Sequence, residues 1–232
     1  MLLRLFAAAC AGAVLALAFE PLALAWLMPL SIAALALLLA GLTGPRRARR
    51  GYAVAATYGT TFMVALLPWL SVVTPAWPAL ALLEGLLIGV VGAGTAAVND
   101  RRWWPVAFAF LWVSLEALRG SWPLGGFPWG RLAFGVVDTP AAALLPWVGA
   151  AGTGFALALL GGVLAWAVLG VRERPLPVLA TVAATLLLVG AGWWVPLDPA
   201  ARVVAGEPVE VAAVQGNTPG IGLAAMAERR RV

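Results

Sequence analysis

The hydrophobic and polar positions of the chain fall into long blocks rather than alternating residue by residue. Apolar stretches are separated by short breaks that contain proline, glycine or charge, such as Glu20-Pro21, the arginine run 46–50 and Asn99–Arg102. Each stretch is long enough to cross a hydrocarbon core about 30 Å thick as a helix. The pattern predicts seven membrane-spanning helices, at 2–19, 22–42, 52–73, 76–98, 103–119, 141–169 and 176–195.

Composition changes the picture from a helical protein to a membrane protein with restricted chemistry. Of the 232 residues, 63% are hydrophobic and 11% are charged, whereas soluble domains average about 45–50% and about 25%. All 15 basic residues are arginine, and histidine is absent, which excludes imidazole bases, most transition-metal sites and lysine Schiff bases. The single cysteine, Cys10, excludes an intrachain disulfide. We interpret Cys10 as a small buried apolar residue.

The orientation of the helices follows from the distribution of arginine among the breaks. Tryptophans near most span ends, including Trp69, Trp77, Trp103, Trp104 and Trp122, are typical of interfacial belts. Successive breaks between spans must lie on alternate sides of the membrane. With this assignment, nine arginines fall on one side and three on the other before the C-terminal tail. By the positive-inside rule, the first side is cytoplasmic, and the residues after 195 are outside. The nine are Arg4, Arg46, Arg47, Arg49, Arg50, Arg101, Arg102, Arg172 and Arg174, and the three are Arg119, Arg131 and Arg202.

Two features near the cytoplasmic side allow more than one interpretation. Arg4, the apolar run that follows it and Ala16–Ala18 together resemble a cleavable signal peptide. The almost immediate second span favours a retained helical hairpin instead. The arginine run 46–50 is interpreted as a solvated topology anchor, with a lipid-specific site as the alternative.

Few ionisable residues lie inside the predicted spans, and these are candidates for function because charge in lipid is expensive. Glu116 and Arg119 lie three residues apart, on one helix face, and are expected to form an ion pair or to contact a polar substrate head. Glu84 has no partner nearby in the sequence. It could pair across helices with Arg119 or Arg131, or remain protonated.

The segment from Gly120 to Pro140 is the most distinctive part of the chain. It is apolar and aromatic but rich in glycine and proline, so it cannot continue a helix and is expected to lie in the headgroup layer. It is interpreted either as an aromatic interface anchor or as one wall of a cleft that admits an acyl chain. Its central residues are Gly126, Phe127, Pro128 and Trp129.

The C-terminal part of the chain has a different character. Residues 209–214 are typical of a short β-strand, and residues 215–219 of the turn that follows it. A single strand does not fold alone, so the sequence is expected to stop just inside a soluble outer domain. We therefore divide the chain into a transmembrane helical domain (1–197) and a linker with the start of a further domain (198–232).

The chain resembles the N-terminal part of apolipoprotein N-acyltransferases. The resemblance depends on Glu116–Gly120, on Gly126–Gly130, on seven spans before an outer segment, and on Val211–Pro219, which is similar to the first strand and turn of a nitrilase-like domain. The implied fold class is an all-α polytopic membrane protein of about seven transmembrane helices, followed by the first strand of an incomplete nitrilase-like α/β domain.

The resemblance implies an enzyme at the outer face of the plasma membrane. It would move an acyl chain from a phospholipid, through an enzyme thioester, to the α-amino group of the diacylglyceryl-cysteine at an apolipoprotein N-terminus. Implied partners are the phospholipid donor, the apolipoprotein N-terminus and the membrane, with no nucleic acid, no cofactor, no metal and a monomeric state. Implied substrate or lipid contacts are Trp129, Phe127, Pro128, Gly126, Glu116 and Arg119.

The sequence departs from the family in its catalytic residues. Members use a Glu-Lys-Cys set in the nitrilase-like domain, but this chain has no lysine, and Cys10 lies in the first span. The 232 residues alone are therefore expected to be inactive, with no catalytic residue among them. The alternative is a non-catalytic polytopic membrane protein that binds lipid or acts as a scaffold.

Overall fold

The computed structural model describes residues 1–123, 125–170, 175–190 and Ala212, and the regular elements among these residues are all helices. Seven are α-helices: α1 (Leu2–Ala16), α2 (Leu27–Ala40), α3 (Arg47–Leu66), α4 (Trp77–Val98), α5 (Trp104–Arg119), α6 (Leu145–Gly170) and α7 (Pro175–Gly190). Three are short 3-10 helices: η1 (Pro68–Val72), η2 (Leu132–Val136) and η3 (Pro140–Leu144).

Each predicted apolar stretch overlaps one α-helix, so the helical class of the described residues is confirmed. The boundaries differ at α2, which begins at Leu27 rather than at residue 22, and at α3, which begins inside the arginine run. In the described part of the chain, two helical segments are long and apolar enough to cross a membrane, namely α4 and the segment Pro140–Gly170. Helices α1 and α2 have 15 and 14 residues and are therefore only about 21–23 Å long.

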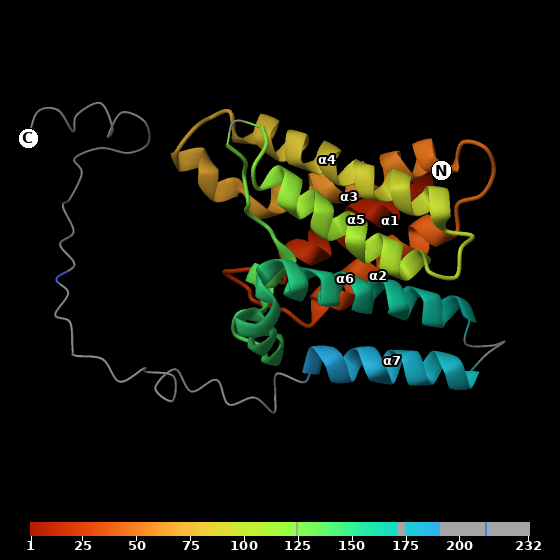
Figure 1. Ribbon diagram of the computed structural model, residues 1–232. Helices are drawn as coiled ribbons and strands as arrows, with labels where there is room; N and C mark the ends of the chain where they lie inside the picture. The colour runs from red at the N-terminus through yellow and green to blue at the C-terminus, as the bar shows by residue number, and fades with distance from the viewer. Residues whose placement is uncertain (124, 171–174, 191–211, 213–232) are drawn as a thin grey trace, which may run out of the picture.

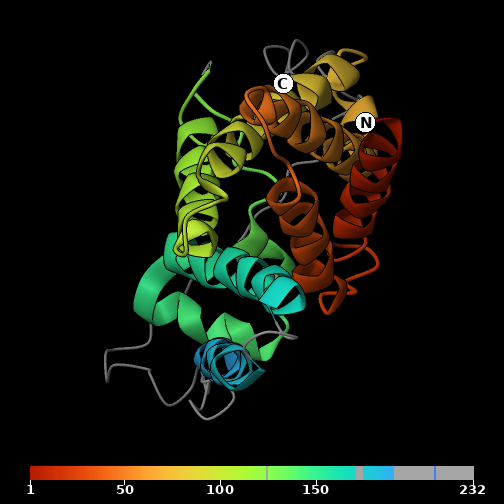
Figure 2. The ribbon, with the colours of Figure 1, turned by 90° about the vertical axis from the view of Figure 1, so that its right-hand side faces the viewer.

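Successive α-helices run back and forth between two ends of the bundle (Figure 1). Helices α1, α3, α5 and α7 begin at the end that we call the arginine-rich end, which carries Arg4 and residues 41–50 and 97–104. The opposite end, which we call the loop end, carries residues 17–26, 67–76 and 120–144. Figure 2, a view along the helices, shows α6 between α7 and the remaining bundle.

Helices α3 and α4 are in close contact because glycines face each other along their length. A Cβ atom added at Gly92 would fall on the backbone carbonyl of Gly51, and one added at Gly85 would fall on the backbone of Thr60. Small residues of this kind allow two helix backbones to approach closely, which is the usual way in which helices associate in lipid. The α3–α4 pair therefore has a fixed register.

A buried polar contact joins the first three helices. The Ser31 hydroxyl of α2 donates to the backbone carbonyl of Ala11 in α1 at 2.7 Å, and it lies 2.7 Å from the Tyr58 hydroxyl of α3. Because the only hydroxyl proton of Ser31 is used for Ala11, Tyr58 is the donor to Ser31. The Tyr58 ring then meets Trp112 of α5 edge to face, with 6.3 Å between ring centroids.

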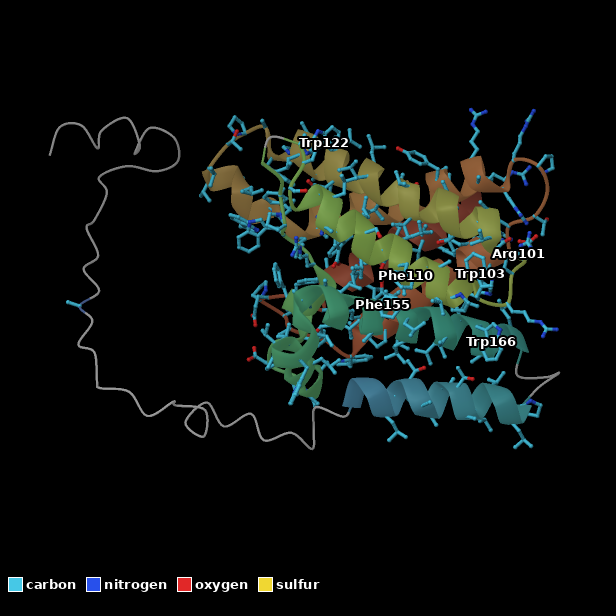
Figure 3. The ribbon with its side chains drawn as sticks, in the orientation of Figure 1. Arg101, Trp103, Phe110, Trp122, Phe155 and Trp166 are labelled. Carbon is cyan, nitrogen blue, oxygen red and sulfur yellow. The ribbon has the colours of Figure 1, made fainter. Side chains whose placement is uncertain are left out.

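Two sequence interpretations are corrected by the packing. Cys10 is exposed, because α1 buries the face that contains Ala8, Ala11 and Leu15 and turns Cys10 outward. Trp104, expected in an interfacial belt, belongs to the core, whereas its neighbour Trp103 is exposed (Figure 3). The first turn of α5 points Trp104 inward, so proximity to a helix end did not determine the direction of the ring.

Several predictions concern residues outside the described part of the chain. These are the strand at 209–214 apart from Ala212, the turn at 215–219, and the arginines at 172, 174 and 202. The division of the chain at residue 197 also lies outside the described ranges and stays a prediction.

Candidate functional site

The candidate site is built on the last two turns of α5, where charged side chains are enclosed by the bundle. Glu84 of α4 is 1% exposed, and Arg119 and Glu116 of α5 are 2% and 4% exposed. Enclosing charged groups costs several kcal/mol each unless partners replace the lost water. The arrangement of those partners defines the site.

Arg119 pairs with Glu84 across the α4–α5 contact. Its Nη1 atom donates to Oε2 of Glu84 at 2.9 Å, and no ion pair joins Arg119 to Glu116. The predicted Glu116–Arg119 pair is therefore wrong, and the alternative of a cross-helix partner for Glu84 is confirmed. Spacing on one helix placed Glu116 and Arg119 close together, but the side chain of Arg119 extends to α4 instead.

Glu116 binds the segment that follows α5 rather than the neighbouring arginine. Its Oε1 atom accepts hydrogen bonds from Trp112 Nε1 at 3.0 Å and from the backbone N–H of Leu132 at 2.9 Å. The other oxygen, Oε2, lies against Gly154 of α6, where an added Cβ would come within 3.1 Å of it. Glu116 thus joins α5 to the start of η2, and the glycine leaves room for its carboxylate.

The aromatic loop, residues 120–131, is attached to the same turn of α5 by backbone contacts. Phe127 donates its N–H to the carbonyl of Arg119 at 2.6 Å, and Arg131 Nη2 donates to the carbonyl of Glu116 at 3.4 Å. Gly126 has φ +86°, and a Cβ there would fall on the backbone of Gly120, so only glycine fits this turn. Both sides of the loop are therefore held by the carbonyls that end α5.

These attachments leave part of the aromatic loop exposed. Trp129 is 51% exposed and packs edge to face on Trp69 of η1, with 5.1 Å between ring centroids. Phe127 is half-buried against the core, and Pro128 is exposed. Trp122, labelled in Figure 3, is also exposed. The result is an exposed tryptophan pair, one member of which belongs to a loop attached to the carbonyls of α5.

The later part of the 120–140 segment differs from the prediction of a single surface loop. Residues 132–136 form η2, in which Leu132, Ala133 and Val136 are buried. Sequence reasoning also missed Trp69, Trp112 and Gly154 as neighbours of the predicted site. Trp112 stands four residues before Glu116, a spacing that could have indicated the contact. The bond to the Leu132 N–H gives no sequence signal because any residue except proline carries that group.

The described residues define an all-helical domain whose buried charged groups are ion-paired or hydrogen-bonded and whose exposed surface carries many large apolar side chains. This arrangement is typical of a membrane-embedded domain. A family model for the apolipoprotein N-acyltransferase N-terminal domain matches residues 11–163, which include Glu84, Glu116, Arg119 and the aromatic loop. The chain belongs to this family.

Curated relatives carry the same name. The chain is 33% identical to an apolipoprotein N-acyltransferase of Chromobacterium violaceum over 94% of its own length and 43% of the relative. It is 36% identical to one of Mycolicibacterium smegmatis over 78% of its length and 33% of the relative. A match to one of Pseudomonas putida is 41% identical over 48% of the chain and 22% of the relative. The chain thus spans less than half of the length of these relatives.

We predict that Glu116→Ala releases the start of η2. The change leaves the Leu132 N–H and the Trp112 indole without their acceptor, which costs about 1–3 kcal/mol for each buried group. Hydrogen exchange at the Leu132 amide should become faster, whereas Glu116→Gln, which keeps a carbonyl oxygen, should retain most of the protection. Glu20→Ala, at an exposed glutamate of the same end, is the control. Unchanged exchange at Leu132 in Glu116→Ala would contradict the assignment.

A double-mutant cycle on Glu84 and Arg119 should show strong coupling. Either Glu84→Leu or Arg119→Leu leaves a buried charge unpaired and should lower the free energy of unfolding by about 3–5 kcal/mol. The double variant should lose much less than the sum, as measured by denaturation in mixed micelles. The matched control is the pair Arg47–Asp100, 3.4 Å apart, in which Arg47 is partly exposed and Asp100 exposed, and for which coupling should stay below about 1 kcal/mol. Additive losses at Glu84 and Arg119 would contradict the pairing.

Proposed function

We propose that this chain forms the membrane domain of an enzyme that moves an acyl chain from a phospholipid to the α-amino group of the N-terminal diacylglyceryl-cysteine of apolipoproteins. The observation that carries the proposal is the family match over residues 11–163, which span the buried charges and the aromatic loop. The names of the curated relatives support the same activity. Their printed names specify N-acyl transfer to apolipoproteins, and the donor lipid is our inference from the resemblance.

The covalent chemistry is proposed to belong to residues outside this chain. Transfer through a thioester needs a thiolate, a base and a cation near the oxyanion. The chain has no lysine, and its only cysteine, Cys10, lies on the outer surface of α1 rather than at the loop end. Residues 198–232 are proposed to begin the nitrilase-like domain that supplies the catalytic set. The 232 residues alone are then inactive.

The membrane placement is proposed from the two ends of the bundle. Arg4, Arg46, Arg47, Arg49, Arg50, Arg101 and Arg102 all lie at the arginine-rich end, whereas Arg119 and Arg131 of the loop end are buried or half-buried. The positive-inside rule then puts the arginine-rich end in the cytoplasm and the aromatic loop outside. In this placement all seven α-helices cross the plasma membrane.

Cysteine labelling tests the orientation. A cysteine introduced at Ala48, at the arginine-rich end, should react with an impermeant thiol reagent only after the membrane is permeabilised. A cysteine at the exposed Ser121 of the aromatic loop should react from outside, and Cys10→Ala provides the background without thiols. Labelling at Ala48 in intact cells would reverse the placement.

The aromatic loop is proposed to line the path of the acyl chain and the glycerol region of the lipid. Trp129 and Phe127 supply flat apolar rings, Pro128 stiffens the backbone between them, and Gly126 allows the tight turn. Glu116 and Arg119 are proposed as positioning residues, because their polar groups bind protein atoms rather than facing outward. The exposed Trp69–Trp129 pair is the surface that a lipid would meet.

A kinetic comparison tests the role of Trp129. In a complete enzyme that carries this domain, Trp129→Ala should slow acylation or lipopeptide transfer by about tenfold, because an apolar wall of the acyl path is lost. Folding and membrane insertion should be unchanged, since the ring is half exposed. Trp77→Ala, at the loop end but outside the aromatic loop, should have little effect, and residues 1–232 alone give the inactive baseline. Equal, small effects of both substitutions would make Trp129 an interfacial anchor.

A further inference from the structure

The arginine-rich end contains a cavity that the proposed acyl transfer does not use. It has a volume of about 370 Å³, within the range of small-ligand sites, and lies at the opposite end of the bundle from the aromatic loop. Its lining includes two arginines, Arg4 and Arg50, and the polar residue Thr43. Met1, Gly41 and Leu42 complete the lining.

Part of the positive charge at this end is used inside the protein. Arg4 donates to the carbonyls of Leu38 at 3.1 Å and Gly41 at 2.7 Å, which caps the end of α2 and fixes the guanidinium at the cavity wall. Arg47 donates to the carbonyl of Ala97 at 2.7 Å and meets Asp100. These two arginines have structural roles that account for their positions.

Arg50 is different because it lines the cavity without a partner. Its guanidinium makes no hydrogen bond or ion pair with any described residue, and the only described acid at this end, Asp100, faces Arg47 and Arg101. Helix α3 begins beside the cavity with no acidic residue in its first turn, so its positive end adds to the local potential. The cavity is thus suited to an anion, and no acidic side chain among the described residues occupies that role.

The surroundings favour an anion that carries an apolar tail. Leu2, Leu3 and Phe6, in the first two turns of α1, are 84%, 79% and 68% exposed, on the helix that contributes Arg4 to the cavity. Figure 3 shows the exposed ring of Trp103 at the same end. Apolar side chains beside a cationic pocket match the layout of a lipid, whose phosphate is attached to acyl chains.

We propose that this cavity binds the phosphate group of an anionic lipid in the cytoplasmic leaflet, with Arg50 and Thr43 as free donors and Arg4 as a fixed charge beside them. The site depends on the membrane placement proposed above but not on the acyl-transfer reaction. It would hold this end of α1, α2 and α3 at the membrane surface.

Native mass spectrometry of the detergent-solubilised protein tests the site, with dioleoyl-phosphatidylglycerol as the anionic probe and dioleoyl-phosphatidylcholine as the zwitterionic one. The protein should retain phosphatidylglycerol in preference to phosphatidylcholine. Arg50→Gln should weaken phosphatidylglycerol binding about fivefold, and Thr43→Val, which leaves the charge unchanged, about threefold. Both positions are exposed, so melting temperatures should not change.

The matched control is Arg49→Gln, which removes the same charge from the neighbouring exposed residue that does not line the cavity. It should reduce binding less than about twofold. Equal losses in Arg49→Gln and Arg50→Gln would overturn the site, as would equal retention of the two lipids. Displacement of phosphatidylglycerol by excess inorganic phosphate would overturn the assignment to a lipid in favour of a free anion. None of these results bears on acyl transfer, which is assayed separately through Trp129.

Discussion

The enclosed ion pair between Arg119 and Glu84 is the interaction on which the loop end depends. A guanidinium without water must find a carboxylate, and here the carboxylate comes from another helix, so the pair fixes how α4 and α5 lie against each other. The position of α4 in turn sets the position of α3, because the glycines between these two helices allow only one close register. The position of α5 in turn determines where its last carbonyls and Glu116 present their acceptors.

Those acceptors explain how an aromatic segment rich in glycine and proline has one defined shape. The loop leaves α5 and returns to it, through the Phe127 N–H on the Arg119 carbonyl and the Leu132 N–H on Glu116. Between these two attachments, Trp129 projects outward and rests on Trp69. The surface proposed to meet the lipid is thereby built on a rigid support, which would reduce the ordering cost of binding.

The sequence was sufficient for the helices and for singling out the buried charges, but not for the connections among them. Long apolar blocks predict helices because hydrophobicity is a local property, and Glu84 and Arg119 stood out because charge is rare in such blocks. The partner of Arg119 depended on the packing of α4 against α5, which no spacing within α5 encodes. The predictions of a buried Cys10 and an interfacial Trp104 were wrong for the same reason, since the direction of each side chain depends on which helix face meets a neighbour.

The Glu84–Arg119 pair also has a consequence for biogenesis. In the proposed membrane placement, Glu84 is the only charge within α4, and a lone charge near a helix centre raises the cost of bilayer insertion by about 2.5–3.5 kcal/mol. Arg119 is the last residue of the next helix, so the charge that compensates Glu84 comes from α5 rather than from α4 itself. When α4 and α5 lie together in the bilayer, the pair is electrically neutral, and it offsets the cost that Glu84 would impose on α4 alone.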